Sequence, residues 1–267
     1  MKIDFEEGKI HYQVSGKGSA LIFLHGFMET AQIWRAFQTE FSMRFSTIAI
    51  DLPGHGESSV FSEIHTMDFM AKAVNAVLKA ENVSRAIFIG HSMGGYVTMA
   101  LADLFPEKIH SVVLFSSSCF ADTEEKKKDR DKAITTAEAS KQKFVSATIP
   151  NLFYQKEGLV AENNIRKMTN MGIDQPLKGI TAAIAGMRDR PDRSHILKNI
   201  KSSMLLLLGG KNDTLVTPEA VSKMAEIAPH AEVILMDECG HNGYIEKEKE
   251  SLAAISDFLI GSLLTLP

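Results

Sequence analysis

The residues best suited to chemistry stand in the motif Gly90-His-Ser92-Met-Gly94, a G-x-S-x-G pattern. An apolar run at residues 86–89 precedes it, and an apolar helical segment at residues 96–104 follows. On such a strand-to-helix turn the serine hydroxyl is exposed in strained geometry, and the N–H groups of the helix favour developing negative charge. The pattern predicts that Ser92 is a nucleophile, whereas the alternative is a glycine-rich turn with only a structural role.

A serine hydroxyl is a weak nucleophile until an oriented base takes its proton. Two partners follow later apolar runs that are typical of strands, namely Asp213 and then His241. Their order and their place at strand ends predict a triad of Ser92, Asp213 and His241. Taken singly, Asp213 also fits a turn cap and His241 an ordinary loop histidine. Asp237, four residues before His241, is the rival acid.

Two backbone N–H groups are candidates for an oxyanion hole, which stabilises the negative oxygen of a tetrahedral intermediate. One N–H normally comes from the residue after the nucleophile and the other from an early loop of the sheet. Met93 follows Ser92, and Phe27 lies in His25-Gly-Phe-Met28 after the apolar run at 20–24. We expect both to act through the backbone, and the alternative for the early loop is an ordinary turn.

The elements that must position these residues alternate along the chain. Continuous apolar runs bounded by Gly, Pro, Asp or Ser are typical of strands buried on both faces, as in a parallel sheet covered by helices. An alternating segment at 10–15 predicts a half-buried edge strand. Helical periodicity fills the gaps, so the fold class is α/β of doubly wound type. The apolar runs lie at 20–24, 47–50, 86–89, 112–115, 204–208 and 233–236. A helical pattern from Met70 to Leu78 follows a candidate cap at Thr66, and further helices are expected at about 218–228 and 246–264.

The segment 120–200 interrupts this alternation. It contains no convincing buried strand, opens with a mixed charge run at 124–132 and continues with helix-compatible sequence divided by prolines. The charge run predicts the solvated face of a helix. We therefore expect a core made of residues 1–119 and 201–267, with a helical cap at 120–200 that folds over the Ser92 site.

Composition limits the possible functions. The chain has 267 residues, of which 45% are hydrophobic and 23% charged, as in ordinary globular proteins and unlike disordered ones. The formal net charge of −4, with no basic stripe, argues against nucleic acid or an anionic membrane as a partner. The sequence gives no indication of the oligomeric state.

The two cysteines, Cys119 and Cys239, form neither a disulfide framework nor a CxxC pair, so we expect two buried thiols and no metal site. The N-terminal residues contain no apolar signal core. The longest purely aliphatic run, at 204–208, is too short to cross a bilayer. The expected location is the cytoplasm.

Taken together, these motifs resemble the α/β-hydrolase superfamily over nearly the whole chain. The resemblance implies an eight-stranded, mostly parallel sheet with a helical cap after the sixth strand, and no cofactor. It also implies a structural role for His55 and an anchor between cap and core at residues 187–192. The matching motifs are His25-Gly26, Asp51-Leu-Pro-Gly-His-Gly-Glu-Ser58, Gly90-His-Ser-Met-Gly-Gly95, Gly210-Lys-Asn-Asp213 and Gly240-His241.

Several activities fit this resemblance. Epoxide hydrolases and haloalkane dehalogenases of the superfamily have Asp where this chain has Ser92. The first hypothesis is therefore a serine hydrolase, with an acyl-enzyme intermediate, that cleaves a small carboxylic ester or related acyl substrate. The second is a carbon–carbon bond hydrolase or lyase with the same triad, in which Arg188 or Arg190 binds an acidic substrate. The third is a non-enzymatic ligand sensor on a hydrolase scaffold.

Overall fold

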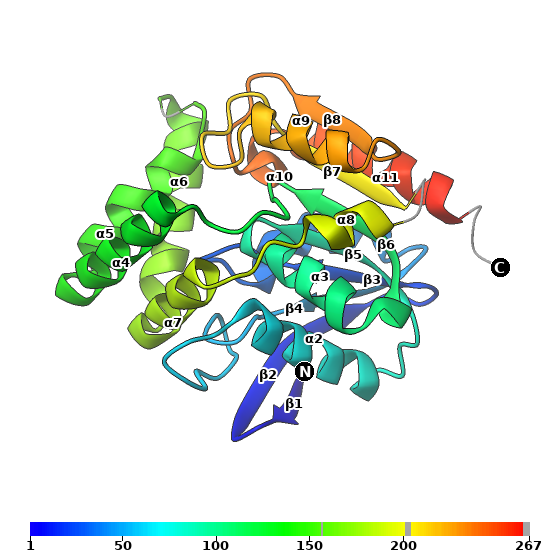
Figure 1. The fold of residues 1–267 in the computed structure, drawn as a ribbon, viewed down its shortest axis with the longest axis horizontal. Helices are drawn as coiled ribbons and strands as arrows, with labels where there is room; N and C mark the ends of the chain where they lie inside the picture. Colours follow the sequence, from blue (N-terminus) through cyan, green and yellow to red (C-terminus); the bar gives the residue numbers. More distant parts are fainter. Residues whose placement is uncertain (156, 201–203, 264–267) are drawn as a thin grey trace.

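An eight-stranded sheet runs through the centre of the molecule, in the order β1-β2-β4-β3-β5-β6-β7-β8 (Figure 1). The computed structural model describes residues 1–155, 157–200 and 204–263. β2 pairs antiparallel with β1 and β4, and all later pairs are parallel. The strands are β1 (Lys2–Phe5), β2 (Gly8–Ser15), β3 (Ala20–Leu24), β4 (Ser46–Ile50), β5 (Ala86–His91), β6 (Ile109–Phe115), β7 (Leu205–Gly210) and β8 (Glu232–Met236).

The central strands confirm the expectation from the apolar runs. Every residue of β3, β5, β6 and β7 is buried, because helices cover both faces of the sheet. The edge strand β8 is half exposed. The short strand β1 alternates exposed and half-buried residues and pairs only with β2, so no apolar run marked it in the sequence.

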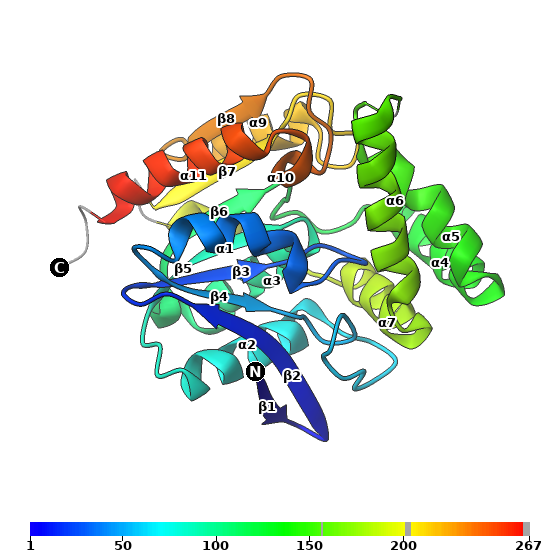
Figure 2. The ribbon, with the colours of Figure 1, turned by 180° about the vertical axis from the view of Figure 1, so that it is seen from behind.

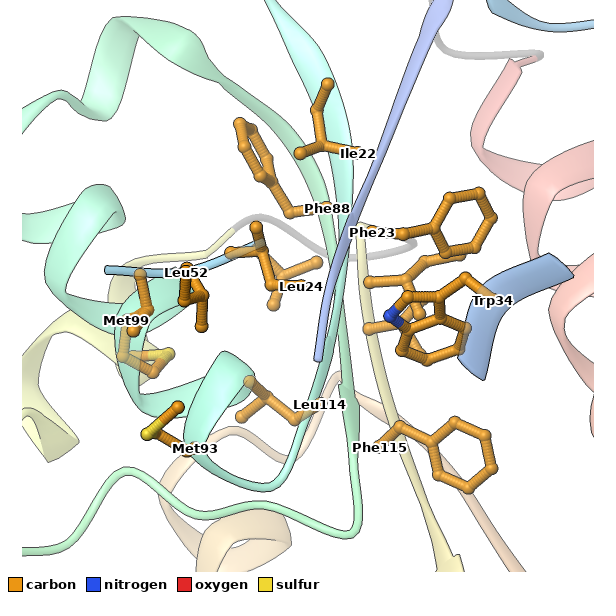
Figure 3. Packing of buried hydrophobic residues seen from close by; sticks show 14 of the residues in the cluster. Ile22, Phe23, Leu24, Trp34, Leu52, Phe88, Met93, Met99, Leu114 and Phe115 are labelled. Atoms are coloured by element: carbon orange, nitrogen blue, oxygen red, sulfur yellow. The ribbon is translucent and has the colours of Figure 1, made fainter. Parts of the chain in front are cut away.

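Helices cover the two faces of the sheet, as Figures 1 and 2 show from opposite sides. Figure 3 shows Ile22 and Leu24 of β3 on one face and Phe23 beside Trp34 on the other, as the alternation of a strand requires. One face carries α2 (Met67–Ala80), α3 (Met93–Leu104), α8 (Ser194–Asn199) and α9 (Pro218–Ile227), and the other carries α1 (Arg35–Phe41), which follows the 3₁₀ turn η1 (Ala31–Trp34), and α11 (Glu248–Leu263).

Helix boundaries follow local capping chemistry. The side chain of Thr66 accepts a hydrogen bond from the N–H of Phe69 at the start of α2, and Thr217 caps α9 in the same way. The expected single C-terminal helix from Glu246 is wrong at its start. A short helix, α10 (Gly243–Glu246), comes first, and α11 begins only after Lys247, whose φ of −134° and ψ of 48° interrupt the helix.

The insertion between β6 and β7 is helical in its described part and has no strand there. Its helices α4 to α7 lie beyond one end of the sheet, and α8 returns to the core (Figure 1). The charge run at 124–132 lies on the largely exposed helix α4, as expected. The elements before α8 are α4 (Glu124–Ala139), α5 (Lys141–Thr148), the 3₁₀ turn η3 (Ile149–Leu152), α6 (Leu159–Asp174) and α7 (Leu177–Arg188).

Arg190 joins the two ends of the insertion to the core. Its guanidinium pairs with buried Asp122 at 2.8 Å, donates to the carbonyl oxygens of Phe120 and Met187, and lies 4.0 Å from the centroid of the Tyr96 ring in α3. Charged guanidinium groups are buried at low cost only when paired in this way. These contacts fit the anchor that the family resemblance implies for this segment.

Candidate active site

Ser92 lies on a sharp turn between β5 and α3, with φ of 50° and ψ of −115°. Such a conformation is strained for a residue with a Cβ atom, and it is typical of a serine held out from a strand-to-helix turn. Gly90 and Gly94 make the turn possible. A Cβ atom on Gly90 would lie 2.5 Å from the carbonyl oxygen of Gly94, and one on Gly94 would collide with the backbone of Leu24.

The structure brings the three predicted side chains into one hydrogen-bonded line. The Ser92 hydroxyl lies 2.8 Å from Nε2 of His241, and Nδ1 of His241 lies 2.8 Å from Oδ2 of Asp213. Because a carboxylate only accepts, Nδ1 carries a proton, and Nε2 is then free to accept the proton of Ser92. The chain order and the distances are those of a Ser-His-Asp triad.

Asp213 is held as a buried carboxylate at the end of β7. Its Oδ1 accepts hydrogen bonds from the N–H groups of Leu215, at 2.8 Å, and Val216, at 3.0 Å. Burial raises the pKa of Asp213, but the His241 ring and these N–H groups outweigh it and lower the pKa below its usual value. Asp213 therefore shapes the turn before α9 and also faces His241.

The rival acid, Asp237, does not face the histidine. Its side chain is 78% exposed and pairs with Lys211 at 2.7 Å. His241, by contrast, is buried, and its backbone N–H donates to the carbonyl oxygen of Leu152 in the insertion at 2.9 Å. The loop that carries His241 therefore contacts the core through Asp213 and the insertion through Leu152 of η3.

The loop after β3 brings Phe27 to the same cavity as Ser92 and His241, and Met93 is the first residue of α3. The first N–H groups of a helix have no partner within the helix, so the Met93 N–H suits an oxyanion. His25 shapes the loop, because its Nδ1 donates to the Gly26 carbonyl and its Nε2 accepts from the Leu52 N–H. Burial lowers the pKa of His25, in keeping with this neutral ring.

A cavity of about 410 Å³ opens over the Ser92 hydroxyl. Core and insertion line it together, and most of its wall is apolar. A charged strip also lines the cavity, and it includes Asp122 together with Lys126 and Arg130 of α4. Neither Arg188 nor Arg190 is among the residues that line the cavity. Arg188 pairs instead with Asp131 and Asp189, and Arg190 with Asp122. The apolar wall includes Phe27, Met28, Phe144, Leu152, Ile184 and Met187.

Other candidates have structural surroundings. His55 is fully buried, and its ring lies 5.2 Å from that of His25, so it packs beneath the loop. Both cysteines are buried thiols, as expected. The described part of the chain holds no group of three or more His, Cys, Asp or Glu side chains suited to a metal ion. Among the helices at residues 1–155, 157–200 and 204–263, none has the length and apolar composition to span a membrane.

Sequence analysis missed a buried pair beneath the site, formed by Glu29 and His91. His91 stands in the serine motif and Glu29 follows the His25 loop, but 62 residues separate them in the chain. Nothing in the spacing indicates that the two side chains meet. Both also line the cavity.

Comparison with known proteins places these features in a family. A thermophilic esterase from Thermogutta terrifontis, solved with malate bound, is 26% identical, with a TM-score of 0.88 over 96% of this chain and 94% of that one. The enol-lactonase from Burkholderia xenovorans LB400 shares the fold at 19% identity, with a TM-score of 0.89 over 97% of this chain and 100% of that one.

A relative in sequence is the dihydrolipoyllysine-residue acetyltransferase component of the acetoin cleaving system of Pseudomonas putida. It is 28% identical over 252 residues, which are 90% of this chain but only 63% of that protein's length. The family model of the alpha/beta hydrolase fold matches residues 19–248, and the sheet, the helical insertion and the Ser92 turn agree with it. The chain belongs to the α/β hydrolase fold family.

Proposed function

We propose that this protein is a serine hydrolase that cleaves a small carboxylic ester through an acyl-enzyme. The observation that carries the proposal is the hydrogen-bonded line from Asp213 through His241 to Ser92, which ends at a largely apolar cavity. The cavity volume lies within the range of about 300–1,000 Å³ that is usual for small-molecule sites. The similarity to an esterase at 26% identity supports the same reaction class.

In the proposed reaction, His241 takes the Ser92 proton as the serine oxygen attacks the ester carbonyl carbon. The N–H groups of Phe27 and Met93 stabilise the negative oxygen of the tetrahedral intermediate. His241 then gives its proton to the departing alcohol, and the acyl group stays on Ser92. A water that His241 deprotonates releases the acid and restores the serine. Asp213 keeps the ring oriented and stabilises its charged form.

The proposal extends to the substrate and to the division of the chain. The apolar wall suits the hydrocarbon part of the ester, and the charged strip suits a polar part of the substrate. We assign residues 120–200 to the cap and residues 1–119 and 201–267 to the core. Within the core, residues 201–203 and 264–267 lie outside the described residues. A cytoplasmic location stays a prediction.

A fluorophosphonate probe followed by a panel of p-nitrophenyl esters of increasing acyl length tests the function. We expect labelling at Ser92 and turnover of short or medium esters. A panel that includes a lactone and a vinylogous diketone separates ester cleavage from carbon–carbon cleavage. Labelling without turnover of any ester would contradict the proposed reaction.

A further inference from the structure

A buried ion pair lies directly beneath the candidate active site. Nδ1 of His91 is 3.0 Å from Oε2 of Glu29, and the two side chains are 1% and 2% exposed. Glu29 accepts two more hydrogen bonds, from the hydroxyl of Tyr244 at 2.8 Å and from the N–H of Gly26 at 2.6 Å. The second ring nitrogen of His91, Nε2, lies 3.1 Å from the carbonyl oxygen of His241.

The partners determine where the protons are. The Gly26 N–H donates at 2.6 Å to Oε2, the oxygen that faces His91, and the Tyr244 hydroxyl donates to Oε1. Because the hydroxyl oxygen of a neutral carboxylic acid is a weak acceptor, the short contact to Oε2 favours a Glu29 carboxylate, which only accepts. His91 therefore faces an acceptor at each ring nitrogen, a carboxylate at Nδ1 and a carbonyl at Nε2. A neutral imidazole has only one N–H and would satisfy only one of them, whereas an imidazolium satisfies both. With Glu29 as a carboxylate, the geometry favours a doubly protonated His91.

The electrostatics agree with this assignment. Burial lowers the pKa of His91, but the charge and hydrogen bond of Glu29 outweigh burial and raise the pKa above its usual value. Burial likewise raises the pKa of Glu29, yet His91, Tyr244 and Gly26 lower it to about 2. Asp213, behind His241, adds to the stabilisation of charged His91. The groups that face the pair are thus Tyr244, His25, His241 with Asp213, and the backbone N–H of Gly26.

The pair connects three segments that supply the proposed catalytic groups. Gly26, which Glu29 holds, directly precedes Phe27 of the oxyanion loop. His91 directly precedes Ser92 and holds the carbonyl of His241. We propose that His91 is a permanently charged positioning residue, with Glu29 as its counter-ion, and that the pair holds the oxyanion loop and the proposed base at the Ser92 turn.

This inference rests on the proposed function for its kinetic consequence, but not for the charge of His91. The pair has no net charge, so it stabilises the geometry without adding a net charge beside Ser92. Hydrogen bonds between ionised groups are about twice as strong as neutral ones. An uncompensated charge at this depth would be strongly unfavourable, so loss of either partner should disturb both loops.

Nuclear magnetic resonance of the wild-type protein with ¹⁵N-labelled histidine tests the charge directly. We expect both ring nitrogens of His91 to stay protonated from pH 5.5 to 8.5, with the signals assigned by their loss in His91→Gln. In Glu29→Gln the ring should become neutral within this range. A neutral His91 ring in the wild type at pH 7 would overturn the proposal, whether or not the protein hydrolyses esters.

Kinetics test the positioning role. We expect Glu29→Gln and His91→Gln each to lower kcat by about 10²-fold, the loss typical of a misplacement of about 1 Å, with KM within about threefold. The double variant should be no slower than the slower single variant, since both changes break one unit. If no ester is turned over, the rate of fluorophosphonate labelling at Ser92 replaces kcat.

The split between kcat and KM, together with a control variant, separates positioning from mere stability. Glu81→Gln is the control, because Tyr12 donates to Glu81 at 2.6 Å far from the site, and this variant should keep wild-type kcat. A lower melting temperature in the Glu29 and His91 variants, with unchanged kcat in the folded protein, would refute the positioning role.

Discussion

Replacing Asp213 with Asn tests the proposed mechanism most sharply, because the structure dictates how the new amide must lie. Oδ1 of Asp213 accepts from the N–H groups of Leu215 and Val216. The amide oxygen of Asn must take that place, since an NH₂ group there would face two donors. The NH₂ group then points at Nδ1 of His241, where it donates instead of accepting.

The consequence is the wrong tautomer of the base. With a donor at Nδ1, the proton of His241 moves to Nε2, and the ring can no longer accept the proton of Ser92. The same change in a serine protease triad lowers kcat by about 10⁴-fold, which corresponds to about 5.5 kcal/mol of transition-state stabilisation. We expect a loss of that size for Asp213→Asn, with the fold intact because the two backbone hydrogen bonds remain.

The assay is hydrolysis of a short p-nitrophenyl ester by the purified variant, with circular dichroism to check folding. Asp237→Asn is the matched control, since this exposed carboxylate pairs only with Lys211 among the described residues, and we expect activity within about twofold of wild type. If Asp237→Asn lost more activity than Asp213→Asn, the assignment of the acid and the tautomer argument would both fail.

Three further predictions concern the nucleophile, the cavity wall and the buried histidines. Ser92→Ala should lower turnover by at least about 10⁴-fold and abolish fluorophosphonate labelling, and more than a tenth of wild-type activity in folded protein would contradict its role. Phe144→Ala or Met187→Ala should shift the preferred acyl length on the ester panel and leave Ser92 reactive to a small fluorophosphonate, because both side chains line the cavity; an unchanged profile would show that the insertion does not select substrate. Burial lowers the pKa of His55 to about 3 and of His65 to about 4. Below pH 6.5 the unfolded chain therefore binds protons that the folded protein does not, so the free energy of unfolding should decrease between pH 6 and 5 by up to about 1.4 kcal/mol per pH unit for each ring. Urea titrations should show a flatter dependence in the double variant His55→Asn/His65→Asn, and an equal slope would refute this origin.

The parts of the site that local patterns encode could be predicted from the sequence. A G-x-S-x-G motif between an apolar run and a helix predicts the turn at Ser92, and strand ends predict where Asp213 and His241 lie. Parallel strands bring their carboxyl ends to one edge, so the three residues meet although 149 positions separate Ser92 from His241.

Other features depend on contacts that no local pattern carries. The pairing of Glu29 with His91 and Tyr244 depends on how the loop after β3 packs against the end of β5 and against α10, and each residue alone has an ordinary context. The break at Lys247 was missed because residues 246–251 are all polar and carry no apolar spacing that could locate the boundary. Among the apolar residues of the insertion, Phe144, Ile184 and Met187 line the cavity whereas Met168, Met171 and Phe153 do not, and no local pattern distinguishes the two groups.

The hydrogen bond from the His241 N–H to the Leu152 carbonyl has a consequence for protein engineering. It makes the insertion a support for the histidine loop as well as a wall of the cavity. A chimera that exchanges residues 120–200 with those of a relative would therefore transplant more than substrate preference. If the incoming segment has no backbone carbonyl at this position, the chimera loses the hydrogen bond that holds its histidine loop. A chimera of this fold should therefore retain the turn at Ile149–Leu152.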